Sequence, residues 1–180
     1  MKARKLLLSV FPIFLMGIAG CSNTNKSPDV TDNIRKSLDQ AGYKDVKVSE
    51  DRDKGVVTLT GDVPTNSDKA QAESIAKSNA ESLVVADQVA VRPPGNESEA
   101  KAVDSDLDKA IEKNLDATLV KHRLKKDVKY DVKNGVVTLT GAVPSQTRRA
   151  QVEKLAASVP NVKQVVNELE VKGQKATATS

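Results

Sequence analysis

The heptapeptide GVVTLTG occurs twice in the chain, at residues 55–61 and again at residues 135–141. When the sequence is shifted by 80 residues, the match extends through a following Val-Pro pair and an alanine-rich segment. No gap is needed between Val48 and Val91, so the 180 residues contain two copies of one unit.

Each copy begins with a predicted helix, because apolar residues recur there at helical spacing. Upstream of Val48 the shift changes to 77, which aligns Ile34 with Ile111 and Leu38 with Leu115. We place this drift in a connection, where changes of length are tolerated. The apolar positions are Val30, Ile34, Leu38 and Ala41 in the first copy and Val103, Leu107, Ala110, Ile111 and Leu115 in the second.

A β-hairpin follows the helix, and the repeated heptapeptide is its second strand. Residues 128–132 alternate between apolar and polar side chains, and Asn134-Gly135 is a strong signal for a two-residue hairpin turn. Such a turn pairs Val132 with Val137 and Tyr130 with Leu139 on one face. The opposite face then shows Val136, Thr138 and Thr140.

The four glycines of the heptapeptides are predicted to serve the backbone. Gly55 and Gly135 permit the positive φ of the turn, and Gly61 and Gly141 let the chain leave the sheet. The alternative is a ligand that approaches the backbone at these glycines, and turn geometry is the favoured interpretation.

A second helix and a last strand complete each copy. A polar cap at Thr65 or Ser145 suits a helix start, and residues 84–91 and 162–171 are expected to form the last strands. A strand reached through a helix is expected to run parallel to a hairpin strand. The predicted fold class is therefore α+β, and each copy is αββαβ with a small three-stranded mixed sheet packed on two helices.

The first twenty residues are typical of a secretory signal. Three basic residues precede an apolar run from Leu6 to Ile18, which is roughly 20 Å long as a helix and short of the ~30 Å bilayer core. The end, Ile18-Ala19-Gly20-Cys21, resembles the lipobox of bacterial lipoproteins. That resemblance implies that the Cys21 thiol takes a diacylglyceryl group, that the signal is cut before Cys21 and that the new amino terminus is acylated, for example with palmitate. Because Ser22 rather than aspartate follows Cys21, the resemblance also implies the periplasmic face of the outer membrane.

Charge argues against nucleic acid as a partner. The formal charge of +4 comes from 28 basic and 24 acidic residues, and removing the three basic residues of the leader leaves 25 against 24, or +1. The remaining charge is uneven: residues 22–95 carry 10 basic and 12 acidic side chains, whereas residues 96–180 carry 15 and 12.

The pattern G-V-V-T-L-T-G-x-V-P between two helices resembles the BON domain, and the likeness covers roughly residues 27–95 and 103–172. We divide the chain accordingly into a lipoprotein signal peptide (1–20), a tether (21–28), a first BON domain (29–92), a linker (93–102), a second BON domain (103–172) and a disordered tail (173–180). A lipobox before two such domains resembles the dual-BON-domain outer-membrane lipoproteins. This resemblance implies that the second domain binds anionic phospholipid through its first helix and supports envelope integrity.

The basic run KHRLKK at residues 121–126 follows that helix, and Arg148 and Arg149 begin the next one. Cations at a helix C-terminus also offset the helix dipole, so the run has a structural interpretation as well. A helical wheel places Lys109, Lys113, Asp116 and Val120 outward. The predicted lipid-binding residues are Lys109, Lys113, Val120, Lys121, Arg123, Lys125 and Lys126.

No constellation for catalysis is present in the sequence. The chain has one histidine, His122, and one cysteine, Cys21, so neither a nucleophile–base pair nor a zinc site can be assembled from them alone. We therefore expect a protein that is not an enzyme and has no cofactor or metal. The alternative function is an osmotic-stress-type periplasmic chaperone or interaction module that meets envelope proteins.

Overall fold

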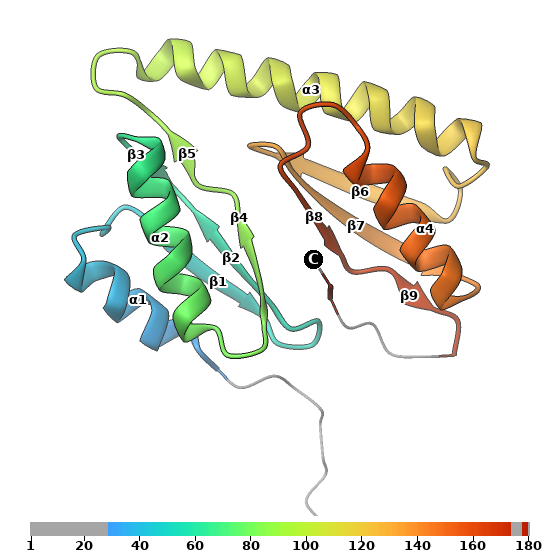
Figure 1. Cartoon of the computed structure of the whole chain (residues 1–180), viewed down its shortest axis with the longest axis horizontal. Coiled ribbons are helices and arrows are strands. Elements are labelled where there is room, and N and C mark those ends of the chain that lie inside the picture. Colours follow the sequence, from blue (N-terminus) through green and yellow to red (C-terminus); the bar gives the residue numbers. More distant parts are fainter. Residues whose placement is uncertain (1–28, 174–177, 180) are drawn as a thin grey trace, which may run out of the picture.

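The computed structural model describes residues 29–173 and 178–179, and it shows two α+β halves of like architecture beside one long helix (Figure 1). The first half contains α1 (Thr31–Gln40), β1 (Lys47–Asp51), β2 (Val56–Thr60), β3 (Asp62–Val63), α2 (Asn66–Asn79), β4 (Val84–Asp87) and β5 (Ala90–Val91). The second half contains α3 (Glu97–Lys121), β6 (Val128–Lys133), β7 (Val136–Val143), α4 (Gln146–Ala157), β8 (Gln164–Asn167) and β9 (Glu170–Val171).

The predicted mixed sheet is present in both halves. In the first, β1 is antiparallel to β2 and β4 is parallel to β2, and in the second, β6, β7 and β8 repeat this order. Two short pairings extend it, β3 with β5 and β7 with β9. Tyr130 lies opposite Leu139 in the second hairpin, so its predicted register is confirmed.

Two helices cover one face of each sheet and form a core with it. Leu59 and Leu139 are fully buried at equivalent positions, and Val132 and Val137 are also buried in the second core. Thr138 points to the opposite face and is half-buried, as alternation along a strand requires.

The repeat is less regular than the ungapped match suggested. Val48 pairs with Leu59, whereas Tyr130 pairs with Leu139, so the first strands differ by 82 residues and the predicted shift of 80 is wrong there. The reason is the hairpin loop, which has four residues between Asp51 and Val56 but only two in the second copy.

The helices also correspond differently from the prediction. The backbone N–H of Tyr43 donates to Leu38 O at 2.9 Å, and that of Leu124 donates to Leu119 O at 2.8 Å, so the shift is 81 rather than 77. The error is one helical turn. Because residues four apart lie on the same helix face, apolar periodicity could not distinguish the two alignments.

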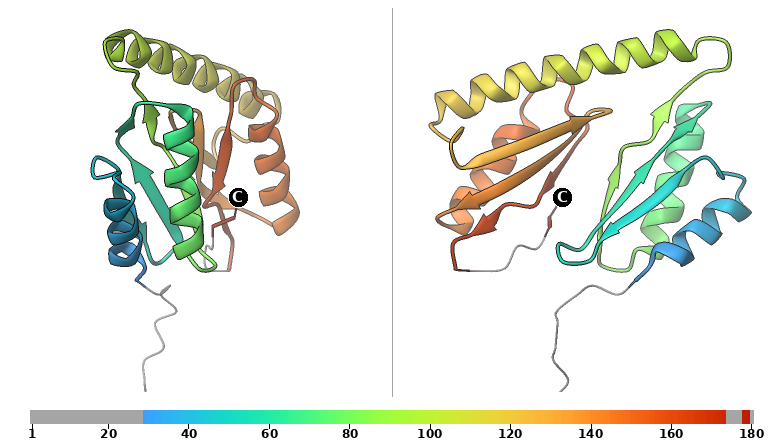
Figure 2. Two further views of the ribbon diagram at one scale, coloured as in Figure 1. Left: turned by 60° about the vertical axis from the view of Figure 1, so that its left-hand side comes forward. Right: turned by 180° about the vertical axis from the view of Figure 1, so that it is seen from behind.

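Helix α3 begins within the predicted linker (93–102). Residues 97–101 belong to this 25-residue helix, and only the Pro-Gly segment before it connects the halves. Glu97 and Glu99 in the first turn favour a helix N-terminus electrostatically, which explains why this charged stretch is helical. Figures 1 and 2 show its first part lying over the junction of the halves. The helical spacing assigned Val103 to the core, but its side chain is 58% exposed, so that prediction is wrong.

The sheet faces that carry no helices meet each other between the halves (Figure 2). Val56 and Ala86 from the first sheet form one buried cluster with Val136 and Val166 from the second. Each pair is related to the other by the 80-residue shift. The junction is thus built from equivalent residues on both sides, so an approximate two-fold axis relates the two halves across it.

Polar contacts repeat the same relation. Lys54 Nζ lies 2.6 Å from Glu168 Oε2, and at the equivalent positions Asn134 Nδ2 donates to Gln88 O at 2.7 Å. The Glu168 hydrogen bond raises the pKa of Lys54. These contacts close the junction at both ends.

The predicted signal, tether and most of the predicted tail lie outside the described residues. Among the helices within residues 29–173, none is long and apolar enough to cross a membrane.

Candidate functional site: the basic end of α3 and the cleft between the halves

The end of α3 is fixed by a Schellman motif. Arg123 adopts a left-handed conformation with φ 57°, and its N–H donates to Val120 O at 3.0 Å. The next residue, Leu124, is 3% exposed and closes the turn by packing in the core. The polar run therefore ends the helix because one leucine within it is buried.

Three predicted cations are exposed around this turn: Lys121, Arg123 and Lys126. Val120 beside them is 57% exposed, as the helical wheel predicted. We call these four residues the basic end of α3. Lys109 and Lys113 of the same helix are also exposed, and Lys109 pairs with Asp106 at 3.3 Å.

Lys125 behaves differently from its neighbours. Its ammonium group pairs with Asp116 and lies 4.8 Å from the ring centroid of Tyr130. The hydrogen bond between them lowers the pKa of the Asp116 carboxyl and raises the pKa of Lys125. The charge of Lys125 is thus partly neutralised. This pairing could not be predicted from the sequence, because Asp116 is nine residues away.

The corresponding turn of the first half lacks these features. Gly42 occupies the left-handed position with φ 92°, and Tyr43 follows it in place of Leu124. A non-glycine residue in this conformation costs roughly 1–2 kcal/mol. The second half accepts that cost and gains an exposed cation at the turn.

Arg149 is not available to a ligand at the surface, although it adjoins Arg148 in the sequence. It is 8% exposed, and its Nη2 donates to Asn167 O at 2.8 Å. The equivalent residue of the first half, Lys69, donates to Val89 O at 2.6 Å and lies 3.6 Å from Asp87. Each of these two side chains binds a backbone carbonyl at or just after the end of β4 or β8.

Burial raises the pKa of Asp87, and the positive charge of Lys69 offsets part of that rise. The second half carries Asn167 at this position, fully buried, and both side chains accept a hydrogen bond from the N–H two residues later. This buried polar position was not predicted from the sequence. Its signal was an Asx residue at the same place in each copy, before a short apolar strand.

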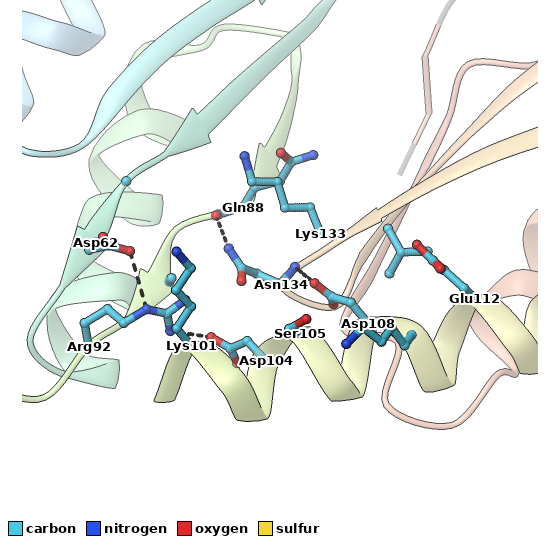
Figure 3. Close-up of a pocket in the computed structure, with 14 residues that line it drawn as sticks. Asp62, Gln88, Arg92, Lys101, Asp104, Ser105, Asp108, Glu112, Lys133 and Asn134 are labelled. Carbon is cyan, nitrogen blue, oxygen red and sulfur yellow. Dashed lines mark hydrogen bonds and ion pairs between the residues drawn. The ribbon is translucent and has the colours of Figure 1, made fainter. Parts of the chain in front are cut away.

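A cleft of about 570 Å³ lies between the halves beneath the first part of α3 (Figure 3). Arg92 forms an ion pair with Asp104 across it. The Asp108 carboxylate accepts the N–H groups of Asn134 at 2.8 Å and Gly135 at 2.9 Å. These polar groups hold α3 against both halves, so their first role is structural.

At Gly61 and Gly141 the group that closely approaches the glycine is the protein's own backbone. A Cβ atom at Gly61 would lie 2.2 Å from Asp45 O, and one at Gly141 would lie 2.2 Å from Asp127 O. Gly55 and Gly135 have φ of 72° and 82°, as expected for turn residues. Within the described part of the chain, no three His, Cys, Asp or Glu residues are placed to hold a metal ion.

Comparison with known proteins agrees with this architecture. The BON domain matches twice, at residues 27–93 and 104–173. The chain is 30% identical to osmotically-inducible protein Y of Escherichia coli K12 over 146 residues, which are 79% of this chain and 71% of that protein. It is 32% identical over 147 residues to a protein of Anaplasma centrale described as an uncharacterized protein in the gshII 5′ region, covering 79% and 92%.

Among solved structures, the C-terminal domain of CdsD, a structural protein of the type III secretion system of Chlamydia trachomatis, aligns with a TM-score of 0.34. The alignment has 15% identity and covers 79% of this chain and 97% of that one. BON domains are generally non-catalytic. The chain belongs to the BON-domain family and carries one BON domain in each half.

Proposed function

We propose that this protein is a lipid-anchored periplasmic protein whose second BON domain binds anionic phospholipid through the basic end of α3 and so supports the outer membrane. The observation that carries the proposal is the placement of Lys121, Arg123 and Lys126 around one exposed turn beside Val120. The equivalent turn of the first domain has no such group.

The expected affinity is low. A cation near an anionic membrane surface contributes about 1 kcal/mol, so three give about 3 kcal/mol, which is weaker than a millimolar dissociation constant. Such a contact matters only for a protein already held at a membrane. The proposed acyl anchor on Cys21 supplies that attachment, and Cys21→Ala should release the protein from the membrane fraction at high salt.

The runner-up function is a stress-related interaction or chaperone-like module. The similarity to an osmotically-inducible protein favours it. It would use the sheet faces or the cleft between the domains, but Val56, Ala86, Val136 and Val166 are buried against one another there. The lipid proposal uses a surface that is exposed, and it is preferred for that reason.

The deciding experiment is co-sedimentation of the chain from Ser22 onward with vesicles that contain or lack phosphatidylglycerol. Binding should require the anionic lipid and fall steeply between low salt and about 0.5 M, because a Debye length of about 3–10 Å screens surface charge. Lys121→Glu with Lys126→Glu should weaken binding strongly.

The matched control is Lys36→Glu with Lys44→Glu, two exposed lysines at the end of α1. Lys69 is unsuitable as a control because it is tied to Asp87 and Val89. If both double variants lose binding equally, total charge rather than this site is responsible. If neither does, the basic end is only a solvated helix terminus, and the interaction module becomes the better proposal.

A further inference from the structure

Strand β4 of the first domain and strand β8 of the second each have one edge that no strand within residues 29–173 covers. Gln88 N–H donates to Leu59 O in β2, so the backbone groups of Val85 and Asp87 face away from the sheet. Glu168 N–H donates likewise to Leu139 O in β7, so the backbone of Asn167 faces outward on β8. A strand edge that pairs with no further strand is a template for another extended chain.

A side chain covers the β4 edge. Gln164 of β8 donates from Nε2 to Val85 O at 2.7 Å, and its Oε1 accepts the N–H of Asp87 at 3.1 Å. The 80-residue shift places Val84 where a reciprocal glutamine would stand, and valine cannot form these bonds. The pseudo-symmetry therefore leaves the β8 edge without the glutamine cover that β4 has. Its Asn167 O accepts from Arg149 Nη2 at 2.8 Å, and no side-chain hydrogen bond to the Asn167 N–H is present within the described residues.

An extended segment of backbone covers the β8 edge instead. Asn167 N–H donates to Thr179 O at 2.9 Å, and Thr179 N–H donates to Asn167 O at 3.3 Å, which is an antiparallel bridge. Ala178 N–H donates to Lys54 O at 2.8 Å, and its methyl group packs against the apolar cluster between the domains. The β8 edge and the Lys54 carbonyl together thus bind a backbone segment from both domains, and they leave room for a small side chain.

We propose that the β8 edge is a docking site for an extended peptide segment of a partner protein, and that Ala178 and Thr179 occupy it in the free chain. The favoured segment has a small residue in the place of Ala178, which meets the apolar cluster. A hydroxyl residue follows it, because Thr179 Oγ1 lies 3.4 Å from Glu153 Oε2. A partner strand would replace the same backbone hydrogen bonds, so the tail and the partner compete for one edge.

The test uses fluorescence anisotropy to measure binding of a labelled KATATS peptide, the sequence of residues 175–180, to chains that comprise residues 22–180. In the unsubstituted chain the tail occupies the edge, and apparent affinity is reduced by the occupied fraction. Ala178→Glu places a carboxylate against the apolar cluster and evicts the tail, so affinity should rise on the order of tenfold. Ala176→Glu is the charge-matched control and should leave affinity unchanged.

Two further measurements locate the binding. A KATETS peptide, with glutamate in the place of Ala178, should not bind the Ala178→Glu chain. Adding Val84→Gln should abolish KATATS binding, because the new amide reaches the β8 edge as Gln164 reaches β4. Amide exchange at Asn167 should accelerate in Ala178→Glu and slow again with saturating peptide, and this holds even if Val84→Gln fails to fold.

Three results would overturn the proposal. The first is equal peptide affinity in the Ala178→Glu and unsubstituted chains, and the second is unchanged Asn167 exchange. The third is concentration-dependent dimerisation of the unsubstituted chain that Ala178→Glu removes, because the occupant would then be the tail of a second copy. The outcome is independent of vesicle binding, which uses the basic end of α3 and none of the residues that contact Ala178 or Thr179.

Discussion

The two BON domains have the same sheet order, each with a core of its own, and they contribute equivalent residues to the junction, yet they differ at the turn after the first helix and at one buried polar position. The first ends its opening helix with Gly42, and the second ends it with Arg123. The first buries Asp87 beside Lys69, and the second buries Asn167 beside Arg149. The comparison shows that the fold tolerates these changes because both cores stay apolar, although Val152 and Leu169 replace Ala72 and Val89 in the second one.

The core is the strongest test of that equivalence. Leu59→Ala and Leu139→Ala should each lower the free energy of unfolding by about 2–5 kcal/mol, because both side chains are fully buried. Urea denaturation of the two variants measures the costs. Thr138→Ala, on the opposite face, should cost less than about 1 kcal/mol. Equal costs for Thr138 and Leu139 would contradict the register.

Exchanging the buried residues Asp87 and Asn167 should change the free energy of unfolding by a smaller amount, and with opposite sign in the two domains. Asn167→Asp puts a carboxylate where Asn167 Nδ2 now donates to Glu153 at 2.7 Å, and it should cost about 1–3 kcal/mol at neutral pH. Asp87→Asn should instead stabilise the first domain at neutral pH, because burial raises the pKa of Asp87.

The pH dependence follows from that direction. Charged Asp87 costs stability above its folded-state pKa, and the cost disappears as the pH falls below the unfolded value near 3.8. Lys69, Glu73 and the Val89 N–H face this carboxyl, and Asp87→Asn removes only its own contribution. Unfolding curves at pH 7 and pH 4 should therefore show a larger gain from Asp87→Asn at pH 7. A larger gain at pH 4 would mean that Lys69 outweighs burial.

The helix-ending turn should show the smallest effect on stability. Arg123→Gly should stabilise the protein by about 1 kcal/mol, and Gly42→Arg should destabilise it by a similar amount. No atom lies within 4 Å of a Cβ built at Gly42, so the cost is conformational. Thermal unfolding measures both. If Arg123→Gly has no effect on vesicle binding, Arg123 is not part of the lipid surface.

The sequence predicted the hairpins and the two-helix cover because these depend on local signals: alternation, the Asn134-Gly135 turn and helical spacing. It did not fix the correspondence of the helices, since a shift of one turn preserves the same face. Nor did it show that Lys125 pairs with Asp116 or that Arg149 is buried, because both depend on tertiary contacts. A signal for the junction was present. Val56 and Val136 are apolar on the face opposite the core.

The buried junction has a further consequence for how the chain is assembled. An interface made from equivalent residues on both partners is the geometry of a two-fold homodimer, in which every contact occurs twice. Here one polypeptide contains both partners, so their association is intramolecular and independent of protein concentration. Joining also removes the requirement that the two surfaces be identical. Gln164 on one side and Val84 on the other are a difference that no pair of identical subunits can have.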